Sequence, residues 1–199
     1  MHKTRWIKAV TGGLVLCLTL SVCGFYGTCA GVRDRVIRLH ILANSDSTAD
    51  QHLKMQVRDA VTAAAAGWLD GAQDTEKALT LAREHLPVIQ QVAQRTVHEA
   101  GYRYPVTVTL DKTYFTTRQY DTVTLPAGTY QAVRIEIGEA KGQNWWCVVF
   151  PPLCFGSAIR EDPMSEVLTG DQQALVSSGE YRVRFAVLEW LEDLFSWFR

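Results

Sequence analysis

The sequence lacks the charge imbalance that marks many binding proteins. Its 199 residues include 20 basic and 21 acidic side chains, which gives a formal net charge of −1. A protein whose main role is to grip a nucleic-acid backbone is usually basic, so we expect no nucleic-acid partner. Internal repeats and low-complexity tracts are also missing. With 47% hydrophobic and 21% charged residues, the composition is that of a globular protein.

The sequence also lacks motifs for metals and cofactors. The histidines between residues 40 and 98 form no HExxH pair, and the cysteines form no CxxC pair. The segment GEAKG at residues 138–142 lacks the Lys-Ser/Thr ending of a phosphate-binding loop. Asp46, Asp50 and Asp59 could form an acid/base group, but aspartates near a helix start are more often caps. We therefore expect no metal, no cofactor and no catalytic residue.

The first thirty residues contain no acidic side chain and differ from the rest of the chain. Lys3, Arg5 and Lys8 precede an uncharged run, residues 9–26, that is rich in Leu and Val. This order is typical of an export signal. The run is also near the minimum length for a membrane anchor, and this alternative stays open. In both cases the folded part lies outside the cytoplasm, because basic flanks stay inside.

A cleavage site can be placed at the end of this segment. Thr28-Cys29-Ala30 has the small-x-small pattern of a signal peptidase site, which puts the cut after Ala30. A lipoprotein signal ending at Cys23 is disfavoured, because the bulky Val22 precedes that cysteine.

Residues 31–199 are expected to form one domain. Without residues 1–30 the chain keeps 17 basic and 21 acidic residues, a net charge of −4, and about 169 residues are enough for one core. Two cysteines remain, Cys147 and Cys154, and an even number in an exported chain permits a disulfide. That bond requires the chain to turn back at Pro151-Pro152.

Hydrophobic periodicity predicts an α+β domain with a mainly antiparallel sheet and helices packed on one face, preceded by the N-terminal signal or anchor helix. Ser47-x-x-Asp50 predicts a helix start, and Pro87 predicts a kink or break in a second helix. The expected elements are strands at residues 36–42, 106–110, 130–137 and 144–150, helices from 47 and from 74 or 75, a hairpin joining the last two strands, a long loop at 156–179, and an amphipathic C-terminal helix at 181–198.

Two neighbouring tryptophans are unusual. Trp145 and Trp146 lie in an expected strand, where adjacent side chains point to opposite faces. A helix is expected to cover one of them. The other meets the second face, where a partner protein, the membrane interface or the terminal helix could shield it.

Three blocks of sequence resemble the stage II sporulation protein R family. The first is IRLHILANSDS at residues 37–47, followed by Asp50-Gln51, Leu53-Lys54 and VRDA at 57–60. The second is PAG-x-Y at 126–130, with G-x-NWWCVVFPPLC at 142–154. The third is YRVRF at 181–185 with Glu189, and the resemblance covers roughly residues 33–190.

The resemblance implies a signalling protein of endospore formation. Such a protein is made in the forespore and exported into the space between the forespore and mother-cell membranes. There it activates a membrane-embedded aspartic protease that processes the pro-form of sigma factor E. The resemblance implies no catalytic residue in the signal itself.

Two partner-binding surfaces are predicted, one at the start of the first domain helix and one around the tryptophan pair. They comprise Asn44, Asp46, Gln51, Lys54 and Arg58, and Asn144, Trp145, Trp146, Pro151 and Pro152. Two alternatives stay open. One is an envelope cysteine hydrolase using Cys147 or Cys154, and the other is a membrane-surface binding module using residues 181–199.

Overall fold

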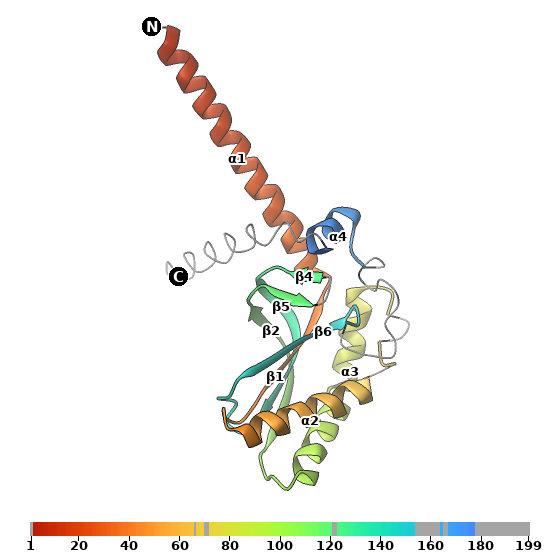
Figure 1. Ribbon diagram of the computed structural model, residues 1–199. Coiled ribbons are helices and arrows are strands. Elements are labelled where there is room, and N and C mark those ends of the chain that lie inside the picture. Colours follow the sequence, from red (N-terminus) through yellow and green to blue (C-terminus); the bar gives the residue numbers. More distant parts are fainter. Residues whose placement is uncertain are drawn as a thin grey trace.

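The domain has an α+β fold and follows a long N-terminal helix (Figure 1). The computed structural model describes residues 2–65, 67–69, 72–120, 123–153, 164 and 167–177. The elements are α1 (His2–Asp34), β1 (Ile37–Leu42), α2 (Thr48–Ala65), α3 (Thr75–Glu99), β2 (Val106–Phe115), β3 (Arg118–Tyr120), β4 (Val123–Leu125), β5 (Gly128–Ile137), β6 (Asn144–Phe150) and α4 (Gly170–Ser177).

The main sheet has four strands in the order β2-β5-β1-β6. β1 is parallel to β5 and antiparallel to β6, and β2 is antiparallel to β5. The predicted hairpin between β5 and β6 is therefore wrong, since β1 lies between them. All six residues of β1 are buried, as expected of a central strand. The connection at residues 138–143 crosses the end of β1 instead of closing a tight turn.

One face of the sheet is covered by α2 and α3. Leu53 and Val57 of α2, together with Ile89 and Ala93 of α3, pack on apolar side chains from all four strands. Ser47 and Asp74 cap the two helices by accepting bonds from the backbone N–H of Asp50 and Lys77. The predicted fold class is confirmed, with mixed strand directions in a mainly antiparallel sheet.

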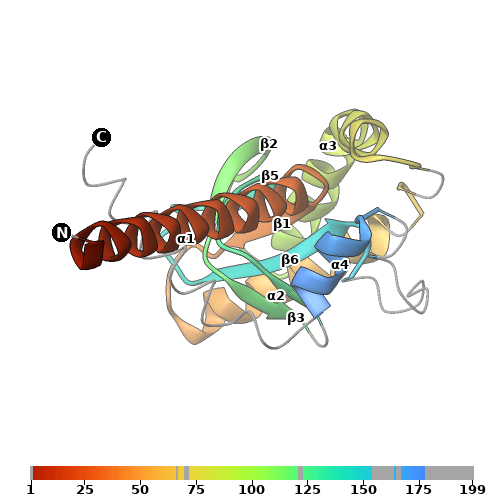
Figure 2. The same ribbon diagram turned by 90° about the horizontal axis from the view of Figure 1, so that it is seen from above.

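The second face is covered at one end by other elements. A second hydrophobic cluster lies here. It is enclosed by the last turns of α1, the β3–β4 pair and α4, and it contains side chains from β2, β5, β6 and the residue directly before β1. Its buried members include Val32 of α1, Phe115 of β2, Leu125 of β4 and Leu175 of α4. Seen from above, α1 passes over this end of the domain beside α4 (Figure 2).

Two further expectations need correction. α3 is one helix from Thr75 to Glu99 with Pro87 inside it, so of the two predicted alternatives at Pro87, a kink or a break, the break does not occur. Pro87 is exposed, and the buried Ala82 and Ile89 on either side of it anchor both halves in the core. Part of the predicted loop at 156–179 is helical, because α4 occupies Gly170–Ser177. The predicted helix at 181–198 lies outside the described residues.

Candidate functional site

The first predicted surface is built around the buried carboxylate of Asp50. Its Oδ2 accepts hydrogen bonds from Asn44 Nδ2 at 2.8 Å and Ser45 Oγ at 2.5 Å. Burial opposes ionisation of this carboxylate. Hydrogen bonds from Ser45, Asn44, Tyr104 and Ser47 outweigh the burial and hold the pKa of Asp50 below its usual range. The carboxylate therefore fixes the connection between β1 and α2.

This connection is tied to the one between β5 and β6. Asp46 Oδ1 accepts from the backbone N–H of Gln143 at 2.7 Å, and Asn44 Oδ1 accepts from that of Glu139 at 3.0 Å. Lys54 Nζ donates to the carbonyl of Gln143 at 2.8 Å. The same ammonium donates to Gln51 Oε1 at 2.7 Å, and Lys54 is only 4% exposed.

The polar residues predicted for partner binding here thus have a structural role. Asn44, Asp46, Gln51 and Lys54 direct hydrogen bonds inward, to two chain connections that are nearly a hundred residues apart in sequence. Burial lowers the pKa of Lys54, and the neighbouring Asp46 counteracts this. Sequence reasoning missed this role because both connections are polar and only the tertiary fold brings them together.

Trp145 and Trp146 do face opposite sides of the sheet, as predicted. Trp145 is half-buried at the edge of the helix-covered core, with the guanidinium of Arg58 5.4 Å from its ring centroid. Arg58 also pairs with the neighbouring Asp59. Arg58 was predicted for the first partner-binding surface. Through its contact with Trp145 it also touches the second one.

Trp146 lies on the second face and stacks on His40. Their ring centroids are 4.1 Å apart with an interplanar angle of 5°. His40 Nε2 and Asn144 Oδ1 are hydrogen-bonded at 2.7 Å, while His40 Nδ1 is buried and has no hydrogen-bond partner among the described residues. Burial lowers the pKa of His40, and the bond to Asn144 opposes this. The neutral imidazole is therefore favoured.

Arg38 lies two residues before His40 on the same face and is fully buried. Its guanidinium carbon is 4.0 Å from the ring centroid of Phe115, 5.0 Å from that of Tyr130 and 5.4 Å from that of Tyr120. Its Nη2 donates to the Tyr120 hydroxyl, whereas Nε and Nη1 have no hydrogen-bond partner among the described residues. Burial lowers the pKa of Arg38.

Sequence reasoning did not select Arg38 or His40 as site residues. The available signal was their alternation with Ile37, Leu39 and Ile41 in β1. By itself, such alternation predicts a strand with one apolar face. In the structure both faces are buried, so a cation and an imidazole are enclosed among aromatic rings.

The remaining predicted residues are placed as follows. Pro151 is buried and follows a cis peptide bond, and Pro152 is half-buried. Cys147 is disulfide-bonded, and Cys154 lies outside the described residues, so their pairing stays a prediction. Ala30 lies within α1, directly after the fully buried Cys29.

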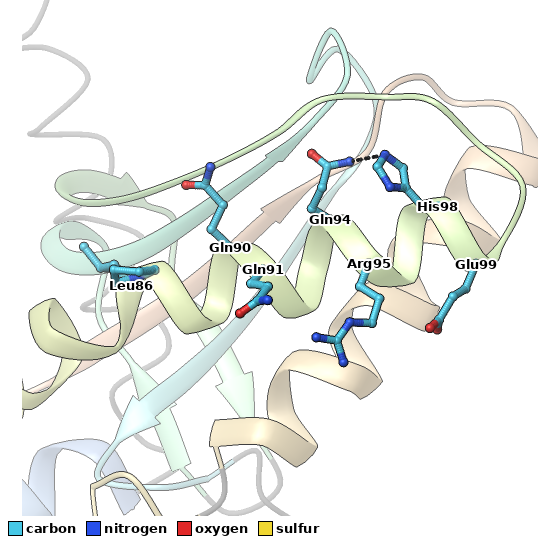
Figure 3. A pocket seen from close by; sticks show the side chains of 8 residues that line it. Leu86, Gln90, Gln91, Gln94, Arg95, His98 and Glu99 are labelled. Atoms are coloured by element: carbon cyan, nitrogen blue, oxygen red, sulfur yellow. Dashed lines mark hydrogen bonds between the residues drawn. The ribbon is translucent and has the colours of Figure 1, made fainter.

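An open hollow of about 670 Å³ runs along the outer side of α3 (Figure 3). Gln94 in its lining bonds to the carbonyl of Tyr104 and to the N–H of Val106, so it fastens α3 to the start of β2. In the described part of the chain, no three His, Cys, Asp or Glu side chains are grouped to hold a metal ion.

Comparison with known proteins identifies the family. The family model for stage II sporulation protein R matches residues 33–160. The stage II sporulation protein R of Bacillus subtilis (strain 168) is 36% identical over 187 residues, covering 83% of this chain and 84% of the relative. No solved structure matches. The matched region contains β1 with Arg38 and His40, the Asp50 network and both tryptophans, and the chain belongs to the stage II sporulation protein R family.

Proposed function

We propose that this chain is an exported signal of endospore formation that activates a membrane-embedded aspartic protease processing the pro-form of sigma factor E. The observation that carries this proposal is its 36% identity to the B. subtilis stage II sporulation protein R over most of both chains. The apolar α1 supports export from the cell that makes the protein. The site of action would be the space between the forespore and mother-cell membranes.

Activation of this kind requires only selective binding. A ligand shifts its receptor toward the active state by binding that state more tightly than the inactive one. A 100-fold shift corresponds to about 2.7 kcal/mol of differential binding, which a modest surface patch supplies.

A ligand without enzymatic activity fits the site chemistry better than the alternative cysteine hydrolase does. A cysteine nucleophile reacts as a thiolate, and the sulfur of Cys147 is already bonded in a disulfide. His40, which lies on the neighbouring strand, presents its ring to Trp146 and Asn144. These contacts support a structural role for both residues.

The second sheet face is the better candidate for receptor contact. Asn144 is exposed, and Trp146 is half-buried beside the exposed Arg118, whose guanidinium is 5.8 Å from the indole centroid. Arg134 and Glu136 form an ion pair at 2.5 Å on the same face, with side chains 38% and 32% exposed. A half-exposed tryptophan with mixed charges around it resembles the centre of many binding surfaces.

Reconstitution in a bacterium that does not sporulate tests the proposal. The full chain would be co-expressed with the protease and with tagged pro-sigma factor E, and cleavage followed by immunoblot. We expect cleavage that depends on this chain and on an intact protease active site. Absence of cleavage, with all three proteins present and folded, would reject the activator role.

Two variants separate the alternatives in the same assay. Joint replacement of Cys147 and Cys154 by Ser is expected to lower stability, with cleavage restored when expression is raised to the wild-type level of folded protein. Loss of cleavage at matched levels of folded protein would favour the hydrolase. Deletion of residues 181–199 tests the membrane-surface module. If that alternative is correct, the deletion abolishes cleavage; cleavage by the shortened protein rejects it.

A further inference from the structure

Three arginines come together on the second face of the sheet. Arg38 lies in β1, Arg134 in the neighbouring β5 and Arg118 in β3. In the parallel register of β1 and β5, Arg134 lies beside His40, two residues after Arg38, so the side chains of both arginines are on the same face. The guanidinium of Arg118 lies 5.8 Å from the indole centroid of Trp146 on that face. The pKa of Arg38 is lowered, first by burial and also by the positive charge of Arg118, so these two guanidinium groups interact.

Acidic side chains of the chain itself balance this charge only in part. Glu136 pairs with Arg134 at 2.5 Å. Asp111 is exposed at the edge of the same face, opposite Ala132 in the register of β2 and β5. It forms no ion pair with any of the three arginines in the part of the chain that the structure describes. Within that part, Arg38 and Arg118 are therefore cations without an acidic partner.

The burial of Arg38 is costly for the fold. Its side chain is fully buried, and Nε and Nη1 have no hydrogen-bond partner among the described residues. Arg134 Nε is buried without a partner in the same sense. A buried cation that is incompletely paired lowers the free energy of unfolding unless other contacts compensate. Proteins keep such groups mainly where binding needs them, and the positive charge of this face is therefore a candidate for recognition.

The outer layer of this face is open to a partner. Arg118 is exposed, the side chain of Arg134 is 38% exposed, and Trp146 is half-buried beside Arg118. A carboxylate placed here would accept charge-assisted hydrogen bonds from Arg118 or Arg134, and the chain that carries it would pack on the indole. Arg38 lies deeper and does not touch the partner. Its charge still attracts the carboxylate, because water screens a buried charge only weakly.

We infer that this face recognises an acidic side chain of the receptor, with Arg118 and Arg134 as direct contacts and Arg38 as a buried charge behind them. This rests on the proposed function, because the receptor is the membrane-embedded protease. A carboxylate is the anion that the site itself favours, since Glu136 already pairs with the planar guanidinium of Arg134. The receptor supplies the acidic partner that the described chain does not give to Arg118.

Charge reversal in the reconstituted cleavage assay tests this inference. At equal levels of folded protein, Arg118→Glu is expected to lower cleavage of pro-sigma factor E at least about tenfold, because it sets like charges against each other. Arg95→Glu is the matched control, since Arg95 is exposed on α3, which covers the other face of the sheet. Equal cleavage by the two variants, with the wild type active, would overturn the inference and leave the proposed function standing. Absence of cleavage with the wild type would instead reject the proposed function.

Variants of the protease supply the second half of the test. Acidic residues in the segments that the protease exposes to the exported protein would be replaced by Lys, one at a time, and each variant tested with the wild-type signal and with Arg118→Glu. We expect one Lys variant that loses cleavage with the wild type and regains most of it with Arg118→Glu. If no replacement is rescued in this way, the anion is not a carboxylate of the receptor and the inference is rejected. That is the result expected if a phospholipid headgroup is the anion.

Arg38→Met separates the buried charge from the fold. Removing this charge is expected to lower cleavage about threefold or more, while the free energy of unfolding is unchanged or higher. Stable protein with reduced cleavage is a result that a purely structural role of Arg38 does not give. Full cleavage by a stably folded Arg38→Met would overturn the role of the buried charge in recognition.

Discussion

The imidazole of His40 lies flat against the indole of Trp146, with 4.1 Å between the ring centroids. His40 belongs to the central strand β1, and Trp146 is its registered partner on the edge strand β6. The contact joins a buried polar side chain to a half-buried aromatic on the face that we propose for the receptor. The first predictions concern this pair.

Trp146→Phe is expected to reduce receptor activation more than it reduces stability. A phenyl ring still covers His40, so the loss in unfolding free energy should be about 1 kcal/mol. The indole N–H and the outer part of the ring would be lost from the exposed surface. Cleavage of pro-sigma factor E should fall about tenfold or more at equal levels of folded protein. Trp145→Phe, on the opposite face, is the control, and equal losses of cleavage in both variants would contradict the proposed surface.

Stability is expected to fall as the pH drops through the range in which histidine titrates. Burial lowers the pKa of His40, so the folded state binds its proton less readily than the unfolded state. The contribution of neutral His40 to the free energy of unfolding is therefore fully present above about pH 6.5. It is lost as the pH falls toward and through the lowered pKa. Urea unfolding of the wild type and of His40→Gln between pH 7 and pH 5 measures this. If the unfolding free energy of His40→Gln falls with pH as steeply as that of the wild type, another group causes the pH dependence.

Asp50→Asn should destabilise the domain by about 1–3 kcal/mol. The carboxylate accepts hydrogen bonds from Asn44 and Ser45. The amide of Asn carries an NH₂ group in place of one oxygen, and this donor cannot accept a hydrogen bond from either neighbour. Urea unfolding at pH 7 gives the free energy. Asp59→Asn, at a side chain that is 65% exposed, should stay within about 0.5 kcal/mol of the wild type. Because the pKa of Asp50 is depressed, its contribution is complete above about pH 4 and is lost as the pH falls through the lowered pKa, so Asp50→Asn and the wild type should converge only as the pH falls through that range.

Gly142→Ala tests whether the connection between β5 and β6 must lie in contact with the connection between β1 and α2. A Cβ at this position would collide with the backbone carbonyl of Ser45, which is held by the Asp50 network and cannot move as a side chain can. We expect a loss of about 1–3 kcal/mol in the unfolding free energy. Gly170→Ala is the control, because nothing lies within 4 Å of the Cβ it would add. Equal stability of the two variants would show that the connection at 138–143 adapts freely.

The sequence allowed the elements to be predicted better than their pairing. The Ser47 cap, the helical period that starts at Asp74 or Thr75 and the apolar run within residues 144–150 act locally, and α2, α3 and β6 begin where they indicate. The order β2-β5-β1-β6 depends on where β1 inserts, and no local signal carries this information. The six-residue link at 138–143 suits a hairpin as well as a crossing over one intervening strand, since two strand spacings are only about 10 Å.

The candidate site shows the same limit at the level of side chains. Asn44, Asp46, Gln51 and Lys54 were predicted to bind a partner because no neighbour in sequence explained their polarity. Asn44, Asp46 and Lys54 find partners in Glu139 and Gln143, about ninety residues away, and Gln51 donates to the carbonyl of Ser45 in the same cluster. Conversely, strand alternation predicted that one of the two tryptophans meets the second face, and the structure identifies that residue as Trp146.

Arg38→Met is expected to leave the domain as stable as the wild type or more stable. The guanidinium is fully buried, and two of its nitrogens have no hydrogen-bond partner among the described residues, which costs several kcal/mol of desolvation. Its stacking on Phe115 and the neighbouring tyrosines recovers only about 0.5–2 kcal/mol for each ring. Met has a similar length and fills the space among aromatic rings without a charge. Urea unfolding of Arg38→Met and Arg38→Lys distinguishes the two effects: Lys keeps the desolvated charge but loses the planar stacking, so it should be the less stable variant. The opposite result is a loss of several kcal/mol of unfolding free energy in Arg38→Met and little loss in Arg38→Lys. It would show that the positive charge itself stabilises the sheet through its contacts with the surrounding aromatic rings.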